Sequence, residues 1–132
     1  MVDFIVASGP VIIEEGKLLV IKDDKDAFYK LPGGTVKQGE DLEDACMRKA
    51  KEEINAEIEI IRPLFPKILY ENPQTKEKMI IVLINYLAKL KNKEEIKVVA
   101  PVNDFKWVGV VNIMEEDVSP NIKALFEREK LK

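Results

Sequence analysis

The chain has 132 residues, of which 46% are hydrophobic and 34% are charged, and its net charge at pH 7 is -3. This length and balance predict one globular domain, residues 1–132, built on a single core. Acidic and basic residues are interspersed, so the sequence offers no extended basic patch, and nucleic acid is not an expected partner. The longest apolar run, residues 79–84, is far below the roughly 20 residues that cross a bilayer, so no membrane partner is expected either.

Two residue counts restrict the chemistry. The chain contains no histidine, which excludes a histidine base and histidine-ligated zinc. Cys46 is the single cysteine, so no intramolecular disulfide can form, and a reducing, cytoplasmic location is the default expectation. Cys46 lies on the apolar face of a predicted helix, so we expect a small core residue and not a nucleophile.

The first part of the chain is predicted to be rich in strands. Residues 11–14 and 17–22 flank Glu15-Gly16, which is typical of a β-hairpin. Residues 28–31 are predicted to form a further strand that leads into the loop Pro32-Gly33-Gly34.

A helix is predicted to follow this loop. Asp41 is a good N-cap, and Asp44 three residues later could complete an arrangement similar to a capping box. Asn55 suits the end of the helix, because asparagine tolerates the left-handed conformation better than most residues. On a helical wheel, Lys49 and Glu53 lie along the apolar face, where an ordinary surface helix would not place charged residues.

The remainder of the chain predicts further strands and a second helix. Strands are expected at residues 57–60, 68–70, 79–90 and 105–111, with a turn at Asn72-Pro73. Ser119 is expected to be the N-cap of a helix that begins at Pro120. A mixed sheet with helices on both faces accommodates this order of elements.

The spacing of five residues around the first helix is the most informative feature. Gly34 is followed six positions later by Glu40, eight further on by Arg48, and four beyond that by the pair Glu52-Glu53. Carboxylates that share one helical turn can converge on a divalent cation, which neutralises phosphate charge and helps to generate a nucleophile. On helix charge alone, the alternative is a solvated helix with the i,i+4 pairs Arg48–Glu52 and Lys49–Glu53.

This stretch resembles the Nudix box, the loop-helix-loop motif of MutT-like hydrolases that cleave nucleoside diphosphates linked to another group. Lys49 and Asn55 depart from the motif, which has glutamate and glycine at these positions. The resemblance implies an α+β fold, an α/β/α sandwich with a mixed sheet and two main helices. It also implies a phosphoanhydride hydrolase that requires Mg²⁺ or Mn²⁺, acts on a small nucleotide and forms a homodimer in some members.

The resemblance further implies roles for individual residues. Glu52, Glu53 and the backbone carbonyl of Gly33 match the positions that hold metal, and the two glutamates are therefore candidate catalytic residues. Glu40 and Arg48 match positions that brace the loop on the helix.

Lys49 leaves the function open. Its ammonium group could pair with Glu53 and weaken metal binding, or it could replace one cation and bind phosphate directly, which makes it a candidate catalytic residue as well. We expect fewer or weaker bound metals in either case. The alternative to a hydrolase is a catalytically silent nucleotide-binding or phosphate-binding module, and a third possibility is a protein-interaction scaffold without nucleotide affinity.

A charged lysine cannot accept a proton, and the resemblance implies that a base could come from a loop outside the box. The candidates are acidic residues in or near predicted loops, and no spacing selects among them: Glu71, Glu94, Glu95 and Asp104. Five aromatic residues could stack on a nucleobase, although core packing is the commoner role of each: Phe28, Tyr29, Tyr70, Tyr86 and Trp107. The substrate itself is left open by the sequence.

Overall fold

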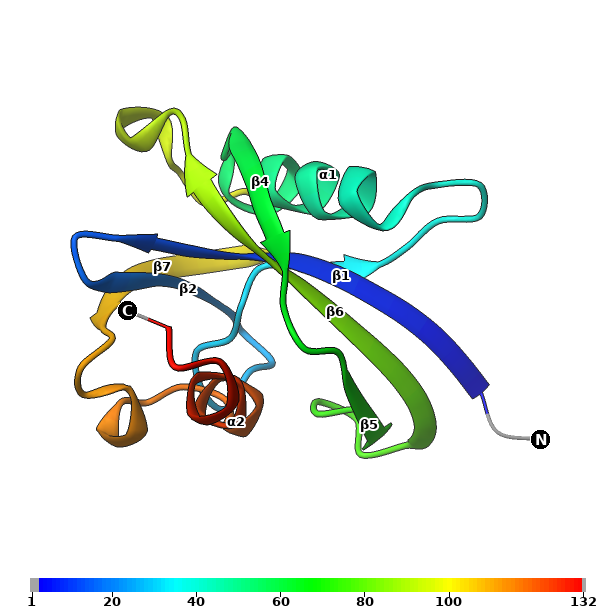
Figure 1. Cartoon of the computed structure of the whole chain (residues 1–132). Coiled ribbons are helices and arrows are strands. Elements are labelled where there is room, and N and C mark those ends of the chain that lie inside the picture. The colour runs from blue at the N-terminus through cyan, green and yellow to red at the C-terminus, as the bar shows by residue number, and fades with distance from the viewer. Residues whose placement is uncertain (1–2, 132) are drawn as a thin grey trace.

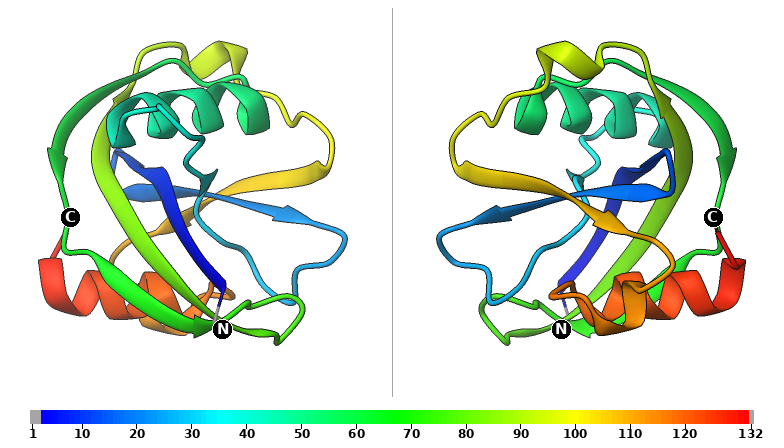
Figure 2. Two further views of the ribbon diagram at one scale, coloured as in Figure 1. Left: turned by 90° about the vertical axis from the view of Figure 1, so that its right-hand side faces the viewer. Right: turned by 90° about the vertical axis from the view of Figure 1, so that its left-hand side faces the viewer.

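A computed structural model describes residues 3–131, and within them a seven-stranded mixed sheet carries one α-helix on each face (Figure 1). Figure 2 shows the same three layers from two further sides. In chain order the elements are β1 (Asp3–Glu14), β2 (Lys17–Asp23), β3 (Gly34–Thr35), α1 (Leu42–Ile54), β4 (Ile58–Pro63), β5 (Lys67–Glu71), β6 (Lys78–Leu90), the 3₁₀ turn η1 (Lys93–Glu95), β7 (Val102–Gly109), the 3₁₀ turn η2 (Ile113–Glu115) and α2 (Pro120–Glu129).

The sheet is organised around two long strands that run in parallel. β1 pairs with β6 from Asp3 opposite Met79 to Ile12 opposite Ala88, and the other pairings are antiparallel. The main strand order is β4-β6-β1-β2-β7, with β5 added to β6 and β3 added to β1. This architecture confirms the α/β/α sandwich with a mixed sheet and two main helices.

Each face of the sheet has its own hydrophobic core, because side chains alternate along a strand. On the α1 side, Ile12 and Leu19 pack with Cys46. On the α2 side, Val11 and Leu18 pack with residues of α2. Cys46 is fully buried, as predicted, and burial raises the pKa of its thiol to about 12. None of the helices in residues 3–131 has the length and apolar content needed to cross a membrane.

Several predicted elements are confirmed, with shifted ends. The β1-β2 hairpin turns at Glu15 and Gly16, which both have positive φ angles. The strands predicted at residues 57–60, 68–70 and 79–90 correspond to β4, β5 and β6. The strand predicted at 105–111 is β7, which begins earlier and ends at Gly109.

The strand predicted at residues 28–31 is wrong. This segment makes only isolated bridges, between Lys30 and Ile21 and between Tyr29 and Val118. Pairing cannot continue because the next residue, Pro32, has no backbone N–H to donate. The segment therefore runs into the glycine loop as irregular backbone.

The helix ends are placed as the sequence predicts, but the N-terminal caps differ in detail. Asn55 has φ 55° and ends α1 in the left-handed conformation. Asp41 occupies the N-cap position, yet its carboxylate makes no capping hydrogen bond, so the capping box with Asp44 is wrong. Asp41 is exposed, which lets water satisfy the first N–H groups of α1. Ser119 is the N-cap residue of α2 and likewise makes no side-chain cap.

Candidate active site

The glycine loop lies directly on strand β1 because two glycines meet there. A Cβ atom on Gly9 would collide with the carbonyl oxygen of Pro32 and would lie 2.7 Å from Cα of Gly33. A Cβ atom on Gly33, whose φ is +149°, would lie 2.8 Å from the carbonyl oxygen of Ser8. Only glycine at both positions lets the two backbones approach this closely. The loop is thereby fixed in front of the C-terminal half of α1.

Arg48 joins this loop to the helix. Its Nε donates to Oε2 of Glu40 at 2.7 Å, and its Nη2 donates to the carbonyl oxygen of Thr35 at 3.0 Å. Its Nη1 donates to Oε1 of Glu52 at 2.8 Å, which is the predicted i,i+4 pair. The hydrogen bonds from Arg48 hold the pKa of Glu40 down at about 2. One guanidinium group therefore joins Thr35 of the loop, Glu40 just before the helix and Glu52 in the last turn of the helix.

Glu53 faces the loop from the helix. Its Oε1 accepts a hydrogen bond from the backbone N–H of Gly33 at 2.7 Å, across 20 positions in the sequence. Burial raises the pKa of this carboxyl, while the Gly33 N–H and then the charges of Lys49 and Lys30 oppose that rise. The structure thus places Glu53 inward, on the apolar side of α1, as the helical wheel predicts.

Lys49 pairs with a different carboxylate from the one expected. Its Nζ lies 3.5 Å from Oε2 of Glu52, and no ion pair joins it to Glu53 within the described residues. The Lys49 stem packs on Gly34, where an added Cβ would lie 2.6 Å from its Cε. Because Glu53 is already bonded to Gly33, the ammonium group settles beside the exposed Glu52 instead. A positive charge therefore stands next to the two candidate metal ligands.

The donor set fits a divalent cation that arrives with its substrate. Within residues 3–131, no three Asp, Glu, His or Cys side chains gather as a preformed metal site. Mg²⁺ in nucleotide sites, however, usually takes only one or two protein carboxylates, because phosphates and water complete its octahedron. Glu52 and Glu53 can supply these, since Oε2 of Glu53 accepts no hydrogen bond from the described residues.

A cavity of about 470 Å³ opens beside the glycine loop. Gly33 and Gly34 line one part of it, together with Lys30. Lys30 is held by ion pairs to Asp26 at 3.0 Å and Asp23 at 3.3 Å. The cavity walls are mostly apolar, which suits the body of an organic ligand.

Only some of the candidate bases and candidate aromatic residues line the cavity. Of the four acidic candidates, Glu71 lines the cavity. Glu94 and Glu95 lie in η1, and Asp104 accepts a hydrogen bond from the Tyr29 hydroxyl. Among the aromatic candidates, Phe28 and Tyr70 line the cavity, whereas Tyr86 and Trp107 belong to the α1-side core.

Sequence reasoning missed polar residues at the α2 side of the same cavity. Asn85, Ser119 and Asn121 line it, and Asn85 and Ser119 are buried. One signal was available: Asn85 is the only polar residue in the otherwise apolar run of residues 79–88. Ser119 and Asn121 gave no comparable signal, because they read as an ordinary helix start.

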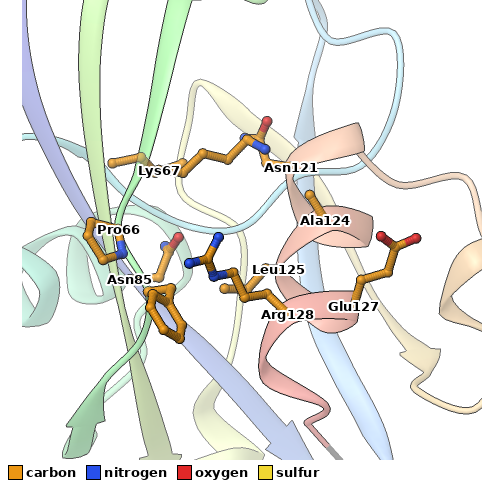
Figure 3. Close-up of a pocket in the computed structure, with 10 residues that line it drawn as sticks. Pro66, Lys67, Asn85, Asn121, Ala124, Leu125, Glu127 and Arg128 are labelled. Carbon is orange, nitrogen blue, oxygen red and sulfur yellow. The ribbon is translucent and has the colours of Figure 1, made fainter.

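A second cavity, of about 410 Å³, adjoins the first and shares Leu83, Asn85 and Asn121 with it (Figure 3). It lies between the segment before β5 and helix α2. Lys67 and Arg128 contribute positive charge to its lining, and the Arg128 guanidinium stacks on Phe65 at 4.1 Å from the ring centre.

Comparison with known proteins places these features in context. The model of the NUDIX domain family matches residues 4–128 of the chain. The nucleoside triphosphatase NudI of Escherichia fergusonii is 27% identical over 122 residues, which cover 83% of this chain and 85% of that protein.

Solved structures share the fold over nearly the whole chain. The MutT protein from Methanosarcina mazei Go1 has a TM-score of 0.78 and 20% identity, and the match covers 99% of this chain and 98% of that chain. A binary complex of the Caenorhabditis elegans Ap4A hydrolase has a TM-score of 0.77 and 20% identity, covering 96% and 95%. A MutT NUDIX hydrolase from Burkholderia pseudomallei has a TM-score of 0.74 and 22% identity, covering 95% and 97%.

Proposed function

The chain belongs to the Nudix family, and from this premise we propose that it is a metal-dependent hydrolase that cleaves a phosphoanhydride in a nucleoside diphosphate derivative. The observation that carries the proposal is the position of Glu53. This carboxylate follows Glu52 in the chain and accepts a hydrogen bond at 2.7 Å from Gly33, which itself lines a cavity large enough for a nucleotide base and sugar. A homodimer and a cytoplasmic location remain predictions from the sequence.

We assign the metal to three groups at the junction of the glycine loop with α1. Glu52, Glu53 and the backbone carbonyl of Gly33 would hold Mg²⁺ or Mn²⁺, which when bound supplies charge neutralisation for the phosphates and activation of a nucleophile. Arg48 and Glu40 act by position, because their hydrogen bonds keep the loop at a fixed distance from the last turn of α1.

Lys49 is assigned to the phosphates. Its ammonium group stands 3.5 Å from Glu52 and beside Gly34, where it can attract a phosphate that binds the same carboxylates through a cation. This permanent charge would replace part of the positive charge that a further metal ion supplies, so fewer ions are needed for each turnover.

Glu71 is the proposed general base. It is the member of the four-residue candidate set that lines the cavity together with Gly33 and Gly34, whereas Asp104 is occupied by Tyr29. We expect Glu71→Gln to lower kcat by about 100-fold or more, the usual contribution of a positioned base. Glu94→Gln is the matched control and should leave kcat unchanged. Equal kcat values for the two variants would remove Glu71 from this role.

The test of the function is hydrolysis of a nucleotide panel with Mg²⁺ or Mn²⁺. The panel starts with nucleoside triphosphates, on which the relative from Escherichia fergusonii acts by name, and includes ADP-ribose, dinucleoside polyphosphates and nucleotide sugars. Turnover should require the metal and be lost in Glu53→Gln. Glu43→Gln makes the same chemical change at an exposed position of the same helix and should retain turnover. Metal-independent turnover, or full activity of Glu53→Gln, would refute the assignment.

A second candidate function is a catalytically silent nucleotide-binding module. One observation favours it: the ammonium group of Lys49 lies beside Glu52, a candidate metal ligand. Lys49→Glu separates the two functions. In a hydrolase it should raise metal affinity and leave metal-dependent turnover measurable, whereas in a binding module it should weaken nucleotide binding and yield no turnover.

A further inference from the structure

Asn85 is a buried polar residue that is not fully paired. It is 5% exposed, sits within the long apolar strand β6 and lines both cavities. Its Nδ2 donates to the carbonyl oxygen of Gly9 at 3.2 Å, which fixes the orientation of the amide. Its Oδ1 accepts no hydrogen bond from the described residues. Ser119 Oγ is the one side-chain atom in the described residues that is cut off from solvent and also has no hydrogen-bond partner. Because Asn85 Oδ1 has no partner either, it must retain accessible surface, and that surface faces the cavity.

The start of α2 supplies donors at the same place. Pro120 has no N–H, and within residues 3–131 no acceptor pairs with the backbone N–H of Asn121. The first N–H groups of a helix point beyond its N-terminus, where the helix dipole is positive. Asn121 lines both cavities, and Ser119, whose hydroxyl has no partner within the described residues, lies two positions earlier in the chain and lines the larger cavity.

Charge in the adjoining cavity favours one kind of ligand group here. Lys67 and Arg128 line it beside Asn85 and Asn121, against the single carboxylate of Glu127 (Figure 3). In Figure 3 the Arg128 guanidinium projects toward Asn85, whereas the Glu127 carboxylate points away from it. An electron-rich carbonyl oxygen is better placed in this surrounding than an amino group, whose hydrogens carry positive charge.

We propose that Asn85 and Asn121 select nucleotides whose base carries a carbonyl group next to a ring N–H. Oδ1 of Asn85 accepts from the ring N–H, and Asn121 donates to the carbonyl oxygen. Guanine, hypoxanthine, uracil and thymine present this edge, whereas adenine and cytosine present an amino group beside an unprotonated ring nitrogen. The apolar walls formed by Ile81, Leu83 and Leu69 receive the faces of the base. This inference rests on the proposed function, because it names the substrate class of the same cavity.

The test compares ITP with ATP, which differ only at this edge of the base. Binding is measured by calorimetry with Mg²⁺ on the Glu53→Gln variant, which the proposed function makes unable to turn the nucleotides over. ITP should bind about five- to a hundredfold more tightly, the range that a paired donor and acceptor give in base recognition. UTP and CTP form a second pair with the same expected order.

Three variants test whether Asn85 and Asn121 cause the preference for ITP over ATP. Asn121→Ala should bring the ITP and ATP affinities within about twofold of each other, and Asn85→Leu should do the same. Asn112→Ala is the matched control, because Asn112 is exposed, lines neither cavity and makes no side-chain cap. If Asn85→Leu does not fold, Asn121→Ala decides, since its side chain makes no hydrogen bond with the described residues.

The outcomes separate this inference from the proposed function. Equal affinities for ITP and ATP, a preference for ATP, or no binding of either would overturn the base selection, even if wild-type protein hydrolyses nucleotides with metal. A preference for ITP that Asn121→Ala retains would also overturn it. A preference for ITP that Asn121→Ala removes would support it, even if wild-type protein shows no turnover.

Discussion

Two regions of the molecule satisfy their polar groups in different ways: the junction of the glycine loop with helix α1, called the α1 end, and Asn85 with the start of α2, called the α2 end. At the α1 end, Arg48 bonds to Glu40, Glu52 and the Thr35 carbonyl, and Glu53 bonds to Gly33. At the α2 end, Asn85 Oδ1 and Ser119 Oγ accept or donate nothing within the described residues. The α1 end is therefore assembled before any ligand arrives, whereas the α2 end lacks partners that a ligand can supply.

The largest effect is expected where the α1 end rests on the sheet. Gly9→Ala would place a methyl group against Pro32 and 2.7 Å from Cα of Gly33, both of them backbone that cannot move without shifting the loop. We expect a loss of about 3 kcal/mol or more in the free energy of unfolding, comparable with other overpacked cores. Denaturant unfolding measures it.

Gly109→Ala is the matched control for this prediction. A Cβ on Gly109 meets no atom within 4 Å, so the same substitution should change the free energy of unfolding little. Similar losses in the two variants would show that the contact between Gly9 and the loop does not set the position of the α1 end.

Arg48→Lys tests whether the α1 end depends on a planar, multiply bonded group. Lysine keeps the charge but cannot bond Glu40, Glu52 and the Thr35 carbonyl together. Stability should fall only slightly, because Glu52 is exposed and water screens its pair with Arg48. Turnover should fall by about tenfold or more, because small shifts of positioned groups are costly. If the variant has the same steady-state kinetics as wild type, the hydrogen bonds of Arg48 are not needed for activity.

The buried charge of Glu53 predicts a pH dependence of stability. Its pKa is higher in the folded chain than the ordinary value of 4.5, so the folded state binds the proton more tightly than the unfolded state does. Ionisation of Glu53 therefore destabilises the fold as the pH rises above about 4.5 and through the raised pKa. Glu53→Gln should melt at a higher temperature than wild type at pH 7, and the two should converge below pH 4.

This pH prediction fails if Glu53→Gln is less stable at pH 7 than wild type. Glutamine keeps an oxygen that can accept from the Gly33 N–H, so the substitution removes the charge without removing the acceptor. Thermal melts at several pH values, with Glu43→Gln as the exposed control, make the comparison.

The smallest effect is expected at the α2 end. Ser119→Ala removes a buried hydroxyl that has no partner among residues 3–131, so the free energy of unfolding without ligand should stay within about 0.5 kcal/mol of wild type or rise. A clear loss of stability would mean that Ser119 Oγ is paired in the free protein. The contrast between the α1 end and the α2 end would then be smaller than the structure indicates.

The features that sequence reasoning recovered are local ones. The hairpin at Glu15-Gly16, the end of α1 at Asn55 and the inward direction of Glu53 each depend on a turn or on the periodicity of one helix. The strand predicted at residues 28–31 failed for a reason outside its own pattern, since it depends on which neighbours β2 already has and on the proline that follows.

The sequence by itself determined the spacing of Gly34, Glu40, Arg48, Glu52 and Glu53, because turn and helix geometry follow from neighbouring residues. Only the tertiary structure decided that Lys49 pairs with Glu52, that Gly9 and Gly33 touch, and that Asn85 lines the same cavity as the start of α2. These contacts join residues far apart in the chain. They arise from the parallel pairing of β1 with β6 and from helices on opposite faces, which no local pattern specifies.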